Sequence, residues 1–183
     1  EEYALNHLIH SLGKPYIAFM DGIVMGGGMG ISQGAALRIA TERTKMAMPE
    51  TAIGLFPDVG GGYFLSRCPG RVGEWLALTG EAIGAEEAMA FGLADGRIAI
   101  EQQAPLWASL GTQSFSDGTA VKDFIASQLI AADAQPVSAR AKIDQYFSLD
   151  SVGAIVAALE AASGEWERAT AATLRKRSPL MLH

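Results

Sequence analysis

The spacing of apolar residues at the start of the chain predicts an amphipathic helix over residues 1–12. Its apolar positions recur at steps of three and four, which places them on one helical face: Leu5, Leu8, Ile9 and Leu12. Gly13 and Pro15 follow and end the predicted helix, because neither residue supports a helix interior. We expect the four apolar residues to form the packing face.

Short apolar runs after this helix predict buried strands. Residues 16–20 form a continuous apolar run, of the kind that is buried on both faces in a parallel sheet. Asp21 and Gly22 are turn-forming residues, and residues 23–25 predict a second strand. Two further strands are predicted over residues 37–41 and 45–48.

Helical patterns dominate the rest of the chain. Four helices are predicted before residue 92, over residues 28–36, 60–68, 72–79 and 81–91, and Gly92 is the expected stop of the last one. A strand over residues 96–100 precedes amphipathic helices around residues 121–125 and 152–159, and a final helix that Ser178 and Pro179 end. The pattern therefore predicts an α/β core over residues 1–100 and a helical segment over residues 101–183.

Composition narrows the classes of protein that this chain can represent. Hydrophobic residues make up 49% and charged residues 19%, which is typical of a folded globular domain. The net charge of −6 does not favour a nucleic-acid partner, and the apolar runs are too short to cross a membrane. Cys68 is the one cysteine in the sequence, so an internal disulfide framework is excluded.

A glycine triplet stands between a predicted strand and a predicted helix. Gly26, Gly27 and Gly28 would present free backbone N–H groups at the start of that helix, where a phosphate or a developing oxyanion can be held. A tight strand-to-helix crossing that needs small residues for packing explains the triplet equally well. Spacing alone leaves both interpretations open.

Two acidic residues interrupt an otherwise apolar and glycine-rich loop over residues 49–62. A carboxylate in apolar surroundings has a raised pKa, which suits acid–base or nucleophilic chemistry, so Glu50 and Asp58 are candidate catalytic residues. Structural roles compete with this hypothesis. Asp58 is well placed to cap a helix that starts near Gly60, and Glu50 fits an exposed or ion-paired loop residue.

Three segments resemble the crotonase superfamily. Residues 14–28 resemble its core pattern of Lys-Pro, alanine and a glycine triplet, and residues 78–92 are similar to its next element. Residues 48–62, which read MPETAIGLFPDVGGG, resemble more specifically the 3-hydroxyisobutyryl-CoA hydrolase family within that superfamily. The resemblance is strong over residues 1–100 and looser over residues 101–183.

The resemblance implies a fold, a substrate and roles for five residues. The fold would be a crotonase spiral of ββα units, and the substrate an acyl thioester of coenzyme A. Glu50 and Asp58 would be catalytic, Gly27 together with Gly26 would provide an oxyanion-hole N–H, and Glu2 would contact the substrate. The implied reaction is hydrolysis of 3-hydroxyisobutyryl-CoA or a close 3-hydroxyacyl-CoA in valine catabolism.

Departures from the superfamily pattern bear on that reaction. Hydratases of the superfamily use two glutamates, and the position of the second is Gly30 in this sequence. Hydrolysis is therefore favoured over an enoyl-CoA hydratase or isomerase, and a non-catalytic protein that binds acyl-CoA or a partner is the alternative of another class. Whether Glu50 acts as a base or as a nucleophile stays open.

Further expectations follow from the same resemblance. The superfamily's first oxyanion-hole segment is expected before Glu1, and the helical segment is expected to continue past residue 183. No metal and no cofactor besides the coenzyme A of the substrate is expected, nor a nucleic acid or a membrane as partner. Assembly into homo-oligomers is expected, in the mitochondrial matrix of a eukaryote or the cytoplasm of a bacterium.

Overall fold

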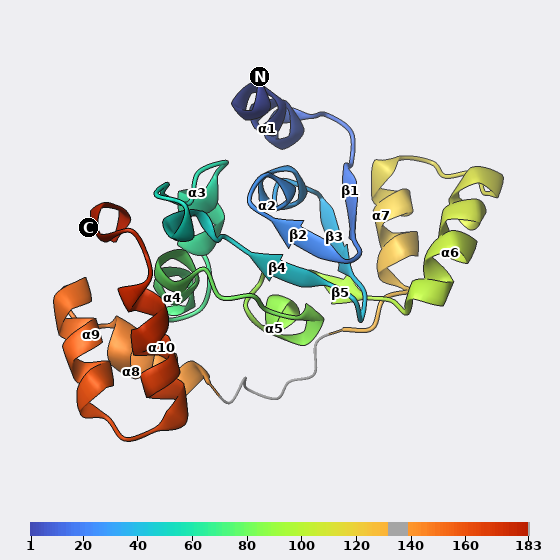
Figure 1. Cartoon of the computed structure of the whole chain (residues 1–183). Coiled ribbons are helices and arrows are strands. Elements are labelled where there is room, and N and C mark those ends of the chain that lie inside the picture. The colour runs from blue at the N-terminus through green and yellow to red at the C-terminus, as the bar shows by residue number, and fades with distance from the viewer. Residues whose placement is uncertain (132–138, 183) are drawn as a thin grey trace.

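The strands of this protein lie in two small parallel sheets. The computed structural model describes residues 1–131 and 139–182 (Figure 1). This part of the chain contains the strands β1 (Ile17–Met20), β2 (Ile23–Met25), β3 (Leu37–Ala40), β4 (Lys45–Ala47) and β5 (Gly96–Arg97). One sheet has the order β1-β3-β5, and β2 pairs with β4 in the other.

A repeated strand–strand–helix unit builds both sheets. Ile17 of β1 is in register with Leu37 of β3, and Ile23 of β2 with Lys45 of β4. Each strand pair therefore contributes one strand to each sheet, and α2 (Gly27–Ser32) crosses over between the first pair and the second. This ββα arrangement agrees with the predicted α/β class.

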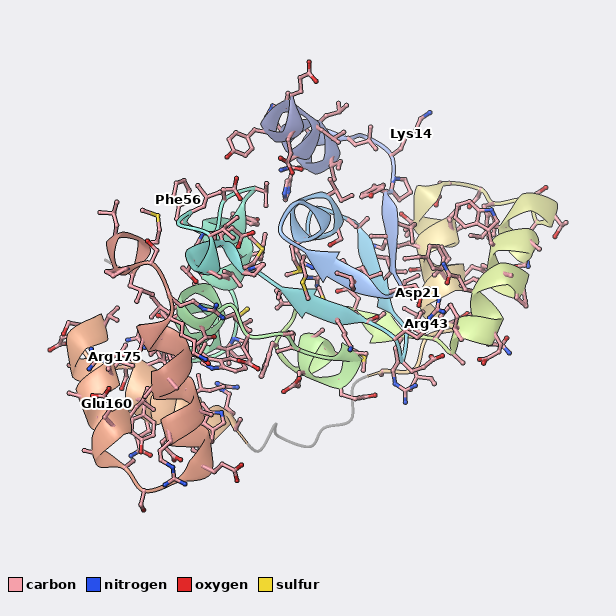
Figure 2. The ribbon with its side chains drawn as sticks, in the orientation of Figure 1. Lys14, Asp21, Arg43, Phe56, Glu160 and Arg175 are labelled. Carbon is pink, nitrogen blue, oxygen red and sulfur yellow. The ribbon has the colours of Figure 1, made fainter. Side chains whose placement is uncertain are left out.

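A polar cluster fixes the turn between β1 and β2. Asp21 accepts hydrogen bonds from the Thr41 hydroxyl and from the guanidinium of Arg43. Figure 2 shows Asp21 and Arg43 next to each other at the lower end of β1. The hydrogen bonds from Arg43 and then from Thr41 lower the pKa of Asp21, and Gly22 turns the chain with a φ of 80°. The predicted Asp-Gly turn is thus reinforced from the end of the next strand.

The remaining helices surround the strands on several sides. They are α1 (Glu2–Ser11), η1 (Glu50–Ala52), α3 (Gly61–Leu65), α4 (Val72–Thr79), α5 (Ala85–Ala90), α6 (Ile100–Thr112), α7 (Gly118–Ala126), α8 (Arg140–Phe147), α9 (Val152–Ala161), α10 (Glu165–Arg175) and η2 (Pro179–Met181). The pair α6–α7 lies beside β1, and the group α8–α10 lies on the opposite side, next to α4 (Figure 1).

Two hydrophobic clusters correspond to this layout. The larger cluster joins the inner faces of the sheets to α3, α4, α5 and the group α8–α10, and Trp75 meets Phe91 there with ring centroids 6.3 Å apart. The smaller cluster lies between β3 and the pair α6–α7, with Ile39 and Ile125 fully buried. Both helical groups after residue 100 therefore share cores with the strands, and the division of the chain at residue 100 stays a prediction.

Several predicted boundaries in the middle of the chain are wrong. The helix predicted over residues 81–91 begins only at Ala85, because Ile83 forms an antiparallel bridge to Met46 and the Glu87 carboxylate caps the N–H of Gly84. The predicted strand 96–100 ends at Arg97, and α6 starts at Ile100. The helix that begins at Gly27 ends at Ser32, short of the predicted residue 36.

The first helix forms as predicted, but the prediction about its packing face is wrong. Leu5, Leu8 and Leu12 are 48%, 56% and 45% exposed, and the buried residue of α1 is Asn6. The helix lies next to α2, above the strands (Figure 1), and its polar residues Glu2 and Asn6 lie against Gly27 and Gly30. Polar residues therefore form part of the inward face of α1.

Candidate active site

Glu50 stands buried at the start of η1, directly after β4. Only 5% of the residue is exposed, which excludes the exposed-loop alternative. One carboxylate oxygen, Oε1, lies 3.0 Å from the position that a Cβ on Gly26 would take. The other oxygen, Oε2, is buried and has no hydrogen-bond partner among the described residues. Glu50 is thus a carboxylate held against the glycine triplet with free acceptor capacity.

The surroundings of Glu50 favour its protonated form. Burial raises the pKa of the Glu50 carboxyl above its usual range, a hydrogen bond from its own backbone partly offsets that effect, and the negative charge of Asp58 raises the pKa further. A carboxyl with a raised pKa accepts and returns protons more readily near neutral pH than an ordinary glutamate. The same charge effect indicates that Asp58 lies close enough to influence Glu50.

Asp58 points toward α1 and does not cap the following helix. The N-cap residue of α3 is Gly60, and no side chain accepts a capping hydrogen bond from the first N–H groups of this helix. The alternative that Asp58 caps α3 is therefore wrong. The carboxylate oxygen Oδ2 of Asp58 instead accepts a hydrogen bond of 2.7 Å from the phenol of Tyr3. Asp58 is half-buried, which leaves it accessible to a bound molecule.

The glycine triplet packs closely against acidic side chains. Gly26 has a φ of 51°, and its N–H donates to the carbonyl of Ala47. Gly27 is the first residue of α2, so its N–H has no partner within the helix. A Cβ on Gly27 would lie 2.5 Å from Oε1 of Glu2. The close approach of Glu2 and Glu50 to the first turn of α2 supports the packing interpretation, and the oxyanion-hole role of the triplet stays a prediction.

Gly30, two residues after the triplet, has no room for a side chain. A Cβ on Gly30 would lie 2.6 Å from the Cβ of Val59 and 3.1 Å from Nδ2 of Asn6. Val59 has a φ of 45° and is the only non-glycine residue with positive φ in the described part of the chain. The strained loop that carries Asp58 thus fills the place that the resemblance assigns to the second glutamate of a hydratase.

Helix α1 contributes two residues that the sequence analysis missed. Tyr3 bonds to Asp58, and Asn6 is 7% exposed with neither amide atom hydrogen-bonded among the described residues. An unpaired buried amide is uncommon and calls for an explanation such as a water or a ligand. Glu2 and Asn6 are four residues apart and share a helical face, and this spacing is the sequence signal that could have identified Asn6.

The end of the chain supports the Glu50 loop from the opposite side. The N–H of Ser178 donates to the carbonyl of Thr51 at 2.9 Å, and the guanidinium of Arg177 donates to the carbonyl of Thr79 at 2.7 Å. The Thr51 hydroxyl in turn donates to the carbonyl of Leu78. These contacts link η1 to α4 and α10, so the helical segment helps to fix the backbone of Glu50.

Other candidate chemistry is limited in the described residues. Residues 1–131 and 139–182 contain no group of three or more histidine, cysteine or acidic side chains placed to hold a metal ion. Cys68 is buried, and burial raises the pKa of its thiol to about 11, so it is protonated at neutral pH. No helix in this part of the chain is long and apolar enough to cross a membrane.

Known proteins resemble this chain over its whole length. The model of a family described as enoyl-CoA hydratase/isomerase matches residues 1–183. A mitochondrial 3-hydroxyisobutyryl-CoA hydrolase of Xenopus tropicalis is 40% identical over 188 residues, which cover 100% of this chain and 49% of the relative. The small ribosomal subunit protein mS47 of Neurospora crassa is 39% identical over 203 residues, which cover 100% of this chain and 40% of the relative.

A solved structure has the same fold. A carnitinyl-CoA dehydratase from Mycobacterium thermoresistibile superimposes with a TM-score of 0.88 at 37% identity, over 99% of this chain and 52% of that protein. The crotonase fold predicted from sequence is thereby confirmed. The chain spans about half the length of the relatives that it matches.

Proposed function

This chain belongs to the enoyl-CoA hydratase/isomerase family, and we propose that the protein containing it hydrolyses the thioester of 3-hydroxyisobutyryl-CoA or a close 3-hydroxyacyl-CoA. Water adds to the thioester carbonyl, the carbon–sulfur bond breaks, and the products are the free hydroxy acid and coenzyme A. Relatives named 3-hydroxyisobutyryl-CoA hydrolase at about 40% identity support this reaction. Its metabolic place would be valine catabolism.

Glu50 is the proposed catalytic carboxylate. As a general base it removes a proton from the attacking water, and as a nucleophile it attacks the carbonyl to give an anhydride that water then cleaves. Its raised pKa and its unpartnered oxygen Oε2 suit either role. Asp58 is proposed to bind the 3-hydroxyl of the substrate or to orient the attacking water.

The glycine triplet is the proposed site of carbonyl binding. The N–H of Gly27, at the first turn of α2, would donate to the oxyanion, while Gly26 lets the substrate approach the backbone. Glu2 reaches the same turn from α1 and is the proposed further contact to the substrate. The proposed reaction needs no metal and no cofactor besides the coenzyme A of the substrate.

One observation favours hydrolysis over hydration. Two carboxylates are needed to add water across a double bond in this superfamily, and Gly30 is enclosed by Val59 and Asn6, so a second glutamate does not fit there. To test this, the protein is incubated separately with a 3-hydroxyacyl-CoA and with an α,β-unsaturated acyl-CoA. Free thiol reports hydrolysis, and the absorbance of the double bond reports hydration. Thiol release without loss of the double bond supports the proposal, and the reverse pattern supports a hydratase.

A non-catalytic role is the second candidate. The likeness to a protein named small ribosomal subunit protein mS47 favours it, because that relative is as similar as the hydrolases. Both Glu50 and Asp58 are present here, which argues for turnover. Tight binding of an acyl-CoA with no release of thiol over hours would support the non-catalytic candidate.

The location of the protein, its partner molecule and its assembly follow from the same proposal. Relatives from Xenopus tropicalis and Danio rerio are named mitochondrial, so the mitochondrial matrix is the proposed location if the source is a eukaryote. The cytoplasm is the proposed location if the source is a bacterium. An acyl-CoA is the proposed partner molecule, and assembly into homo-oligomers is proposed from the fold.

A further inference from the structure

One hydrogen bond ties the first helix to the loop of the candidate active site. The phenol oxygen of Tyr3 lies 2.7 Å from Oδ2 of Asp58, a usual distance for an O–H···O bond, and the two residues are 55 positions apart. The acceptor is a carboxylate, which makes the bond stronger than one between neutral groups. Tyr3 is 62% exposed, so its ring adds little packing. The hydroxyl is therefore the part of Tyr3 with a specific contact.

The bond fixes one oxygen of Asp58 and leaves the other available. Among the described residues, Oδ1 of Asp58 accepts no side-chain hydrogen bond, although a carboxylate offers about four acceptor sites. The hydrogen bond to Asp58 is the main cause that raises the pKa of the Tyr3 phenol. Tyr3 consequently stays protonated at neutral pH and acts as the donor.

The loop around Asp58 needs such a support. It runs through Val59 and Gly60, both with positive φ, before α3 begins, so no regular backbone ladder holds the Asp58 side chain in one orientation. Tyr3 approaches from α1, next to Glu2, whose carboxylate lies against Gly27. In the first turn of α1, Tyr3 thus orients the carboxylate of Asp58, and Glu2 supplies a second carboxylate.

We propose that Tyr3 is a positioning residue that holds Asp58 with Oδ1 facing the acyl group, and that it thereby sets the preference for a hydroxylated acyl chain. This inference rests on the proposed function, because it assigns a specificity role within the same site. A site that is built to bind a hydroxyl rejects the analogue that lacks it, provided that its polar groups are held in place. Without the Tyr3 bond, Asp58 rotates and discrimination falls.

The decisive experiment compares Tyr3→Phe with Tyr63→Phe in the full-length protein. Tyr63 is a matched control, because its ring is 56% exposed, contacts α1 through His10, and its hydroxyl makes no hydrogen bond among the described residues. The readout is the ratio of kcat/KM for 3-hydroxyisobutyryl-CoA to that for isobutyryl-CoA. We expect Tyr3→Phe to lower this ratio about tenfold and Tyr63→Phe to leave it unchanged.

An unchanged ratio in Tyr3→Phe, or an equal fall in Tyr63→Phe, overturns the inference. If the wild type hydrolyses neither thioester, the proposed hydrolysis fails separately, and the ratio of the two dissociation constants from calorimetry replaces the kinetic ratio. A wild-type binding preference for the hydroxylated thioester that Tyr3→Phe lowers then supports the role of Tyr3. No wild-type preference, or no change in it, overturns that role.

A spectroscopic titration tests the contact without any substrate. Ionisation of the tyrosines of the full-length protein is followed by ultraviolet absorbance, and the wild type should contain one that ionises later than an ordinary phenol because of Asp58. That late phase should be absent in Tyr3→Phe and should move to lower pH in Asp58→Asn. A late phase that is unaffected by Asp58→Asn contradicts the contact on which the inference depends.

Discussion

Replacing Glu50 by glutamine separates the catalytic role of this residue from its effect on stability. The amide keeps the shape of the carboxylate, but it neither accepts a proton nor attacks a carbonyl. Loss of a general base usually lowers the rate about 10²–10⁴-fold while substrate binding is largely kept. We expect a fall of that size in kcat for thioester hydrolysis, with KM changed much less.

The same substitution should stabilise the fold at neutral pH. Oε2 of Glu50 is buried without a partner, and an unpaired buried polar group costs about 1–3 kcal/mol, more when it is charged. A neutral amide removes the charge, so the free energy of unfolding should rise by about 1 kcal/mol at pH 7. Gain of stability with loss of activity is typical of a residue retained for function.

The pH dependence of this gain has a definite sign. Burial raises the pKa of folded Glu50 above that of an unfolded glutamate, about 4.3, so the folded protein binds the proton more tightly. The wild type therefore loses stability as the pH rises from the unfolded pKa through the folded pKa. The advantage of Glu50→Gln should be present at pH 7 and should disappear near pH 4.

Urea unfolding at the two pH values, together with release of coenzyme A, measures both effects. Glu81→Gln serves as the control, because Glu81 is exposed and its carboxylate makes no hydrogen bond among the described residues. Turnover like the wild type in Glu50→Gln would refute the catalytic role. A loss of stability at pH 7 would refute the claim that Glu50 is an unpaired buried carboxylate.

Four further substitutions test the remaining claims. Asp58→Asn should reduce the preference for a hydroxylated acyl-CoA over its unhydroxylated analogue, and an unchanged ratio of kcat/KM would remove Asp58 from substrate recognition. Gly30→Ala places a Cβ 2.6 Å from that of Val59, so thermal unfolding should show a loss of about 1–3 kcal/mol, and Gly30→Glu should lower hydrolysis without a gain of hydration beyond traces. Arg38→Met removes two hydrogen bonds to Asp95 and should cost about 2 kcal/mol in urea unfolding, whereas an unchanged midpoint would make this ion pair irrelevant to stability.

Local sequence patterns were sufficient for most of the strands and for two carboxylates of the candidate site. The apolar runs that contain Ala18, Val24, Ile39 and Met46 became strands, and each of these four residues is buried, as the composition of the runs predicts. Glu50 and Asp58 were recognisable because charged residues are rare within an apolar, glycine-rich loop. The resemblance to a known family supplied the role of Glu2, which no local pattern indicated.

Contacts between distant segments account for what the sequence analysis missed. The apolar stripe of α1 predicted a buried face, yet Asn6 is the residue that packs inward, because α1 meets the glycine surface of α2. The bond from Tyr3 to Asp58 links residues whose proximity only the tertiary structure creates. Similarly, the sequence pattern placed Ile83 in a helix, whereas in the structure it pairs with Met46. Tertiary contacts of this kind override the local propensity for helix or strand.

Release of free coenzyme A by the full-length protein from a panel of thioesters tests the central claim most directly. The panel contains 3-hydroxyisobutyryl-CoA, isobutyryl-CoA and an α,β-unsaturated acyl-CoA, and a thiol reagent reports product continuously. We expect the highest kcat/KM for 3-hydroxyisobutyryl-CoA, a much lower value for isobutyryl-CoA, and a rate near background in the Glu50→Gln variant. Thiol release that is absent, or that is equal for all three thioesters, would contradict it.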